Sequence, residues 1–341
     1  MSKKFKFWLN IATFIALVVL GYAARHQIVE ALLQLQDLNA YALLMIIPIQ
    51  MFSYLSAGKV YQTYFATVGE HVNLKKLFKI SFELNFINQV FPSGGVSGFS
   101  YLHVRLRKLG ISTAKSTLAQ GVRYALTFVS FIVFLVFGML SLAAFGRASG
   151  MAILISTTLA CLIVFGAIIA IYIISNEQRI KSFLGFLPKV FNRVVRKVRR
   201  HKDRADTINM ERLEHVFGEL HKDYLLIASN WRSLMRPFFW SMALLFFEIA
   251  TIYIVYVAFG ELINPGALIL AYAVANIAGL ISIMPGGVGV YETLMTSVLA
   301  SVGVDSGLAF SATLVYRIIN MLLFLPPGYF LYQRALKEHE L

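Results

Sequence analysis

Two arginines lie inside stretches of the chain that are otherwise apolar enough to cross a membrane, Arg123 and Arg317. Placing an arginine at the bilayer centre costs about 2.5–3.5 kcal/mol on insertion scales, so an interaction must offset that cost. The planar guanidinium group binds phosphate through two parallel hydrogen bonds. One interpretation is therefore that each arginine holds the phosphate of a lipid headgroup.

Acidic residues provide a second interpretation of the same arginines. Glu83, Glu248 and Glu292 also lie in or next to apolar segments. Arginine and carboxylate would then only tie helices together, since a buried charge requires a partner. Glu248 lies in the middle of a predicted span, and together with Glu83 it is a candidate for proton coupling as well as for ion pairing.

Backbone-breaking residues interrupt two further apolar regions, in "PSGGVSGF" from Pro92 and in "PGGVGV" from Pro285. Proline ends a helix, glycine lets other groups approach the backbone, and the next helix presents free N–H groups to an anion. Asn88, before the first break, could donate to a headgroup or cap freed carbonyls; the glycines could instead serve close helix packing. The expected substrate-binding residues are Pro92, Gly94, Gly95, Gly98, Asn88, Arg123, Pro285, Gly286, Gly287, Gly289, Glu292 and Arg317.

The elements that must position these residues are membrane-spanning helices. The chain of 341 residues is 58% hydrophobic and only 14% charged, whereas a soluble domain carries about 25% charged residues. Apolar runs long enough to cross about 30 Å of hydrocarbon cover 7–24, 40–57, 116–145, 151–175, 237–259 and 308–332. The first is expected to be a retained span rather than a signal peptide, because many apolar segments follow it.

The distribution of basic residues predicts the orientation. With a cytoplasmic N-terminus, the inside segments hold 27 of the 31 Lys and Arg residues, as the positive-inside rule requires. Both termini are then cytoplasmic. The interrupted region 78–104 enters and leaves from the cytoplasm, and the interrupted region 266–302 enters and leaves from outside. Re-entrant hairpins are favoured over pairs of full spans, because "VSGFSYLHV" is short for a span.

The two halves of the chain correspond to one another. Each half contains two spans, an interrupted hairpin and a further span. Corresponding segments of the two halves cross the membrane in opposite directions. Broken segments in equivalent places are the sequence pointer to a transporter's binding site. The sequence therefore predicts an all-α polytopic membrane protein with an inverted-topology repeat, six full spans and two interrupted hairpins. The first repeat covers 1–145 and the second covers 146–341.

A polar insert at 176–236 lies within the second repeat. "LPKVFNRVVRKVRRHK" places valines and a phenylalanine on one helical face and basic residues largely elsewhere. Such a cytoplasmic helix is attracted to anionic lipid at the membrane surface. Nucleic-acid binding is not expected, because stacking aromatic residues are scarce among the basic ones.

Three segments together resemble a known family. "FINQVFPSGGVSGFSYL", "ISIMPGGVGVYETL" and "VYRIINMLLFLPPGYFLY" are similar to the flippase-like membrane domain of the lysylphosphatidylglycerol synthase family, over nearly the whole chain. In full-length members this domain is thought to move a charged phospholipid between leaflets, while a soluble domain aminoacylates the lipid. We expect this protein to be a stand-alone membrane domain without that soluble domain, so the resemblance implies translocation rather than synthesis and leaves the lipid open.

The expected function is therefore a lipid translocase of a bacterial or archaeal cytoplasmic (inner) membrane, for an anionic phospholipid or a polyprenyl-phosphate lipid. The alternative is a membrane-integral transferase, or an accessory subunit, that binds such a lipid without moving it and uses Glu292 or Glu248 as base. No hydrolase, P-loop or metalloprotease motif occurs, so neither enzymatic activity, a cofactor nor a metal is expected. Anionic membrane lipids are the expected partners, and a second copy or a lipid-modifying enzyme is left open as a protein partner.

Overall fold

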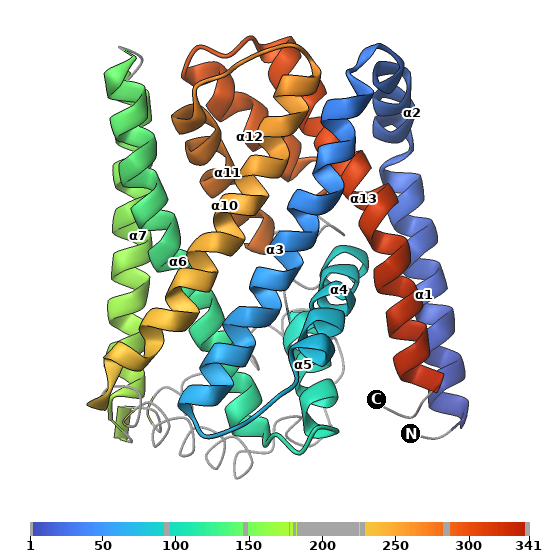
Figure 1. Cartoon of the computed structure of the whole chain (residues 1–341), viewed down its shortest axis with the longest axis vertical. Coiled ribbons are helices and arrows are strands. Elements are labelled where there is room, and N and C mark those ends of the chain that lie inside the picture. The colour runs from blue at the N-terminus through green and yellow to red at the C-terminus, as the bar shows by residue number, and fades with distance from the viewer. Residues whose placement is uncertain are drawn as a thin grey trace, which may run out of the picture.

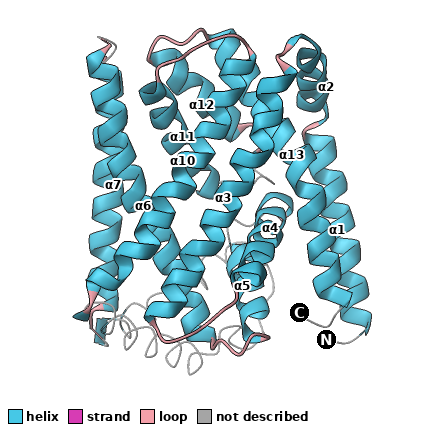
Figure 2. Cartoon of the chain, in the orientation of Figure 1, coloured by secondary structure: helices cyan, strands magenta, loops and turns pink. Residues whose placement is uncertain are grey.

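A computed structural model describes residues 3–91, 96–145, 149–176, 229–281 and 287–337, together with residues 178, 179, 182 and 225. Its described part contains helices and loops only (Figure 2). The helices are α1 (Lys3–Ala23), α2 (Arg25–Gln34), η1 (Leu35–Asp37), α3 (Ala40–Thr67), α4 (Leu74–Val90), α5 (Val96–Arg107), α6 (Thr113–Ala144), α7 (Gly150–Ile174), η2 (Trp231–Leu234), α10 (Met235–Ala258), α11 (Pro265–Ile281), α12 (Val290–Ser301) and α13 (Ser306–Lys337).

Five of these helices are long and apolar enough to cross a membrane, and a sixth span results if α1 and α2 are counted as one broken helix, bent by 59°. The five helices coincide with the predicted spans 40–57, 116–145, 151–175, 237–259 and 308–332, so an all-α polytopic membrane protein is confirmed. The predicted span 7–24 corresponds to α1 alone. The predicted ends differ in places. We expected one span to stop at residue 57, but α3 continues to Thr67 because Tyr61, Tyr64 and Phe65 are buried beyond the charged Lys59.

The outer surface of the bundle is apolar, as a lipid-facing surface must be. On α7 the exposed large side chains are Met151, Ile153, Leu154, Leu162, Val164, Phe165, Ile168, Ile169 and Tyr172. Contiguous exposed apolar area of this kind marks contact with lipid or with a partner. The helix starts, by contrast, are polar: the side chains of Asn39, Asn73 and Ser112 accept hydrogen bonds from the first backbone N–H groups of α3, α4 and α6, which have no partner within the helix.

The two interrupted regions form short helical hairpins, α4/α5 and α11/α12. Their helices have 17, 12, 17 and 12 residues, or about 26 and 18 Å, less than the hydrocarbon thickness. Figure 1 shows α4 and α5 in one half of the molecule and α11 and α12 in the other, while the beginning of α1 and the end of α13 lie at the same end. Re-entry, and a cytoplasmic location of the termini, stay predictions.

Helix packing follows a reciprocal pattern. The long helices α3 and α10 pack along each other at the centre; α4 packs on α13, and α11 packs on α6. Both of the latter crossings use a glycine: Gly328 of α13 lies against the backbone of Phe82, and Gly138 of α6 lies against Gly266 of α11. Small residues allow such close approach. An inverted repeat would produce this exchange of partners; the repeat boundaries at 145 and 146 are still predictions.

Several predicted features fall outside the described residues. These are Pro92, Gly94 and Gly95 of the first break, Pro285 and Gly286 of the second, and most of the insert 176–236 with its basic amphipathic segment.

Candidate functional site

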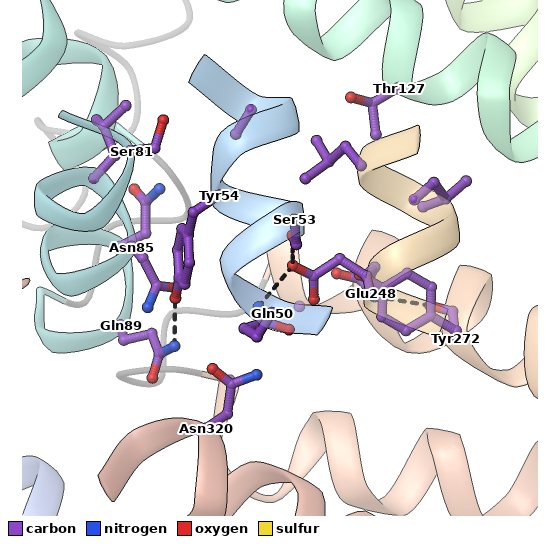
Figure 3. A pocket seen from close by; sticks show the side chains of 18 of the residues that line it. Gln50, Ser53, Tyr54, Ser81, Asn85, Gln89, Thr127, Glu248, Tyr272 and Asn320 are labelled. Carbon is purple, nitrogen blue, oxygen red and sulfur yellow. Dashed lines mark hydrogen bonds between the residues drawn. The ribbon is translucent and has the colours of Figure 1, made fainter. Parts of the chain in front are cut away.

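A polar cavity of about 370 Å³ lies inside the bundle, between α3, α4, α6, α10 and the second hairpin with α13. Its polar wall consists mainly of amides, hydroxyls and tyrosines, with Glu248, Arg123 and Arg317 as the charged groups. The polar lining residues are Gln50, Ser53, Tyr54, Tyr61, Ser81, Asn85, Asn88, Gln89, Arg123, Tyr124, Thr127, Glu248, Tyr272, Asn276, Tyr291, Tyr316, Arg317 and Asn320. Figure 3 shows α3 and α4 facing one another across the cavity, with Asn85 and Gln89 on the α4 side.

Glu248 projects from the middle of α10 and is held by hydrogen bonds from neutral groups. Gln50 Nε2 donates to Glu248 Oε1 over 2.9 Å, and Ser53 Oγ donates to the same oxygen (Figure 3). Thr251 donates to Gln50 Oε1 at 2.9 Å, which fixes the orientation of the Gln50 amide. No ion pair joins Glu248 to either cavity arginine among the described residues. The Glu248 carboxyl group is therefore positioned by neutral donors and forms no ion pair in the described part of the chain.

Arg123 projects from α6 into the same cavity. Its Nη1 donates to the Tyr61 hydroxyl at 3.1 Å, and its guanidinium lies 5.4 Å from the Tyr61 ring centre. The Nε–H is buried without a hydrogen-bond acceptor, and no carboxylate within the described ranges pairs with this side chain. A guanidinium with an unused donor facing a polar cavity is equipped to bind an anion.

Arg317 has a different environment. Its Nη1 donates to Glu292 Oε1 at 2.6 Å, with both side chains largely buried. The other carboxylate oxygen, Oε2, accepts from the backbone N–H of Gly289 at 2.7 Å and so caps the start of α12. Gly289 has φ +87°, a backbone conformation that favours glycine. Arg317 therefore balances the charge of a helix-capping carboxylate, and the ion-pairing interpretation applies to this arginine.

Glu83 forms an ion pair that the sequence analysis missed. Arg105 of α5 donates from Nε and Nη2 to the two carboxylate oxygens of Glu83 at 2.8 and 3.0 Å, and Tyr101 adds a hydrogen bond at 2.8 Å. The alternative that Glu83 pairs with Arg123 or Arg317 is not what the structure has: Glu83 pairs with Arg105, and this bidentate contact ties the two helices of the first hairpin together.

Asn88 and Gly98 meet across the first break. Asn88 lines the cavity, and its Oδ1 rests so close to Gly98 that a Cβ atom at this position would collide with it. The same Oδ1 has no hydrogen-bond donor in the described part of the chain. A larger residue at position 98 would require the Asn88 side chain to shift. With glycine there, the amide oxygen of Asn88 remains an unused acceptor at the cavity.

The predicted site residues thus divide into three groups. Asn88, Arg123, Glu248, Gly287 and Arg317 line the cavity. A second group supports the cavity wall through the contacts given above: Gly98, Gly289, Glu292 and Glu83. The third group, which lies outside the described residues, consists of Pro92, Gly94, Gly95, Pro285 and Gly286. The tyrosines and amides of α3 and α11 were not predicted, because single polar residues in an apolar helix do not indicate which face they occupy. No cluster of three metal-ligating side chains occurs among the described residues.

These features define a class: a polytopic α-helical membrane protein with a polar, charged cavity bordered by two broken hairpins. The chain belongs to the family of the lysylphosphatidylglycerol synthase TM region, whose sequence model matches residues 8–328. This confirms the family indicated by the three sequence segments.

Two curated relatives are also similar to parts of the chain. A UPF0104 membrane protein of Methanothermobacter thermautotrophicus is 33% identical over 119 residues, which cover 33% of this chain and 36% of that protein. A UPF0104 membrane protein of Pyrococcus horikoshii is 25% identical over 146 residues, covering 42% of each chain. The matches therefore span less than half the length of these archaeal relatives.

Proposed function

We propose that this protein moves a lipid with an anionic headgroup, a phospholipid or a polyprenyl-phosphate lipid, between the leaflets of the cytoplasmic membrane. The observation that carries the proposal is Arg123, a guanidinium in a polar cavity within the bundle that has no carboxylate partner among the described residues. A phosphodiester accepts two parallel hydrogen bonds from the planar guanidinium group, whose donors no carboxylate occupies in the described part of the chain. No covalent chemistry is part of this proposal.

The position of the cavity supports movement rather than binding alone. Asn88 of the first hairpin and Tyr291 of the second both line the cavity. The distribution of basic residues predicts that the two hairpins enter the membrane from opposite faces. A headgroup that passes the first hairpin would then meet the second hairpin halfway across the membrane. Broken helices that meet at the midplane are a recurrent arrangement in secondary transporters.

The uncharged lining suits the rest of a polar headgroup. Asn85 Nδ2, Asn88 Oδ1 and the Tyr291 hydroxyl are buried without a partner in the described part of the chain. Together they offer both donors and acceptors, which the hydroxyls of a glycerol or sugar headgroup can satisfy. The family's name and the membrane location support a lipid-related role.

The test is lipid movement in vesicles containing the purified protein. Labelled phosphatidylglycerol should exchange between leaflets faster with the protein than without it. The variant Arg123→Lys keeps the positive charge but loses the planar guanidinium group with its parallel donors. It should reduce the rate of lipid exchange about tenfold or more, since a hydrogen bond to a charged group contributes about 1.5–3 kcal/mol. Arg107→Lys is the matched control, because Arg107 is exposed on α5, and its rate should equal that of the wild type.

Three outcomes separate the alternatives. Equal rates for wild type and a folded Arg123→Lys variant would contradict the role of Arg123. Lipid binding without any movement would favour the transferase or accessory-subunit hypothesis. Neither binding nor movement for any phosphate-bearing lipid would contradict the proposal as a whole.

A further inference from the structure

The fixed charges of the cavity cancel only while no phosphate is bound. Arg317 is neutralised by Glu292 at 2.6 Å, which leaves the positive Arg123 and the negative Glu248 as the charged lining groups that form no ion pair in the described part of the chain. Both side chains line the same cavity. A phosphodiester at Arg123 would add one negative charge that the cavity does not balance.

We infer that Glu248 takes up a proton when a lipid phosphate binds at Arg123, so that headgroup and proton cross the membrane together. This inference rests on the proposed function and adds its coupling. An uncompensated charge is costly inside a bilayer, and protonation of Glu248 is the change that restores neutrality. Glu83, the other carboxylate considered for this role, is occupied by its bidentate contact with Arg105.

The hydrogen bonds around Glu248 fit both protonation states. Oε1 accepts from Gln50 and Ser53, and the Gln50 amide is fixed by Thr251, so its nitrogen cannot turn away. Oε2 faces the Tyr316 hydroxyl at 3.4 Å. A hydroxyl can donate to a carboxylate and accept from a carboxylic acid. The proton therefore belongs on Oε2, and no other contact of Glu248 has to break.

The neighbours of Glu248 leave this carboxyl as the group that exchanges protons. The titratable or charged side chains that line the cavity together with Glu248, from the helices that pack on α10 and from α12, are Arg123, Arg317, Tyr54, Tyr61, Tyr124, Tyr272, Tyr291 and Tyr316. Arg232 of η2, which precedes α10, is exposed. Tyrosine and arginine keep their protons at neutral pH, so they hold or donate hydrogen bonds without exchanging the proton.

Two measurements test the inference. In vesicles with a pH difference, wild-type protein should accumulate labelled phosphatidylglycerol in the leaflet facing the alkaline side. Glu248→Gln, which imitates the protonated form, should still equilibrate the lipid but without accumulation. Glu261→Gln is the matched control, because Glu261 is exposed beyond the end of α10, and it should accumulate lipid like the wild type.

In weakly buffered micelles, adding short-chain phosphatidylglycerol should draw about one proton per bound lipid from solution, because binding and protonation are linked. Glu248→Gln should bind without proton uptake. This readout does not depend on movement. If the wild type moves lipid without accumulation and without proton uptake, the proton coupling is overturned while the proposed function stands. A folded Glu248→Gln variant that moves no lipid also overturns the coupling. Absence of all movement, with proton uptake retained, is instead a failure of the proposed function.

Discussion

At the scale of single residues, the two intramembrane arginines have separate tasks. Arg317 neutralises Glu292, the carboxylate that caps α12, whereas Arg123 donates a hydrogen bond to Tyr61. Removing Arg123 breaks no ion pair in the described part of the chain, and Tyr61 keeps its hydrogen bond to Gln120. Substitutions at Arg123 should therefore alter lipid binding, and substitutions at Arg317 should alter stability.

Arg317→Ala should destabilise the protein by about 3–5 kcal/mol, because it leaves the Glu292 carboxylate buried without its cation. Adding Glu292→Gln removes that charge while keeping an acceptor for the Gly289 N–H, and should recover part of the loss. Thermal unfolding in mild detergent measures both effects, with Arg107→Ala as an exposed control. Unchanged melting of Arg317→Ala, or a double variant as unstable as the single one, would show that the ion pair does not stabilise the fold.

Residue chemistry was only partly predictable from the sequence. Asn88, Arg123, Glu248, Gly287 and Arg317 were identified because each is costly or conformationally special inside an apolar segment, and all five line the cavity. Which carboxylate forms an ion pair with which arginine was not predictable. Arg105 and Glu83 lie on opposite sides of the break after α4, and the angle at which α5 returns decides whether they meet.

At the scale of elements, hydropathy located the spans but not all of their ends. A hydropathy run ends where charge appears, as at Lys59, while a helix continues as long as its packed face does; α3 therefore extends to Thr67. Likewise α13 runs through Pro326 and Pro327 to Lys337. Prolines are tolerated within spanning helices because neighbouring groups satisfy the freed carbonyls.

Helix crossings at glycine should be sensitive to a single methyl group. At Gly328 a Cβ atom would lie 2.8 Å from the Phe82 carbonyl oxygen, a backbone atom that cannot move aside alone. Gly328→Ala should therefore cost about 1–3 kcal/mol through overpacking. Gly166→Ala on α7, where no atom lies within 4 Å of the new methyl, should be neutral or stabilising by up to about 1 kcal/mol.

Denaturant unfolding of both variants in the same detergent provides the comparison. Equal stabilities would mean that α4 and α13 are not in close contact at Gly328.

At the scale of the whole molecule, orientation rests on the uneven distribution of basic residues. If the positive-inside rule holds, the turn after α5 is cytoplasmic and the turn after α10 faces outward. Cysteines at the exposed positions Lys108 and Leu262, placed singly in a Cys161→Ala background, report on these two turns.

A membrane-impermeant maleimide added to intact cells should label Leu262→Cys and leave Lys108→Cys unlabelled until the membrane is opened. Labelling of both from outside, or of Lys108→Cys alone, would contradict the predicted orientation and with it the inverted entry of the hairpins.

The central claim is that the cavity holds a lipid phosphate at Arg123, and mass spectrometry of the intact protein released from mild detergent tests it most directly. The wild type and the exposed control Arg107→Ala should retain a phosphate-bearing lipid under conditions that strip surrounding lipid. Arg123→Ala should lose this lipid while remaining folded, because no carboxylate loses a partner. An Arg123→Ala variant that retains the same lipid in the same proportion as the wild type would contradict the account.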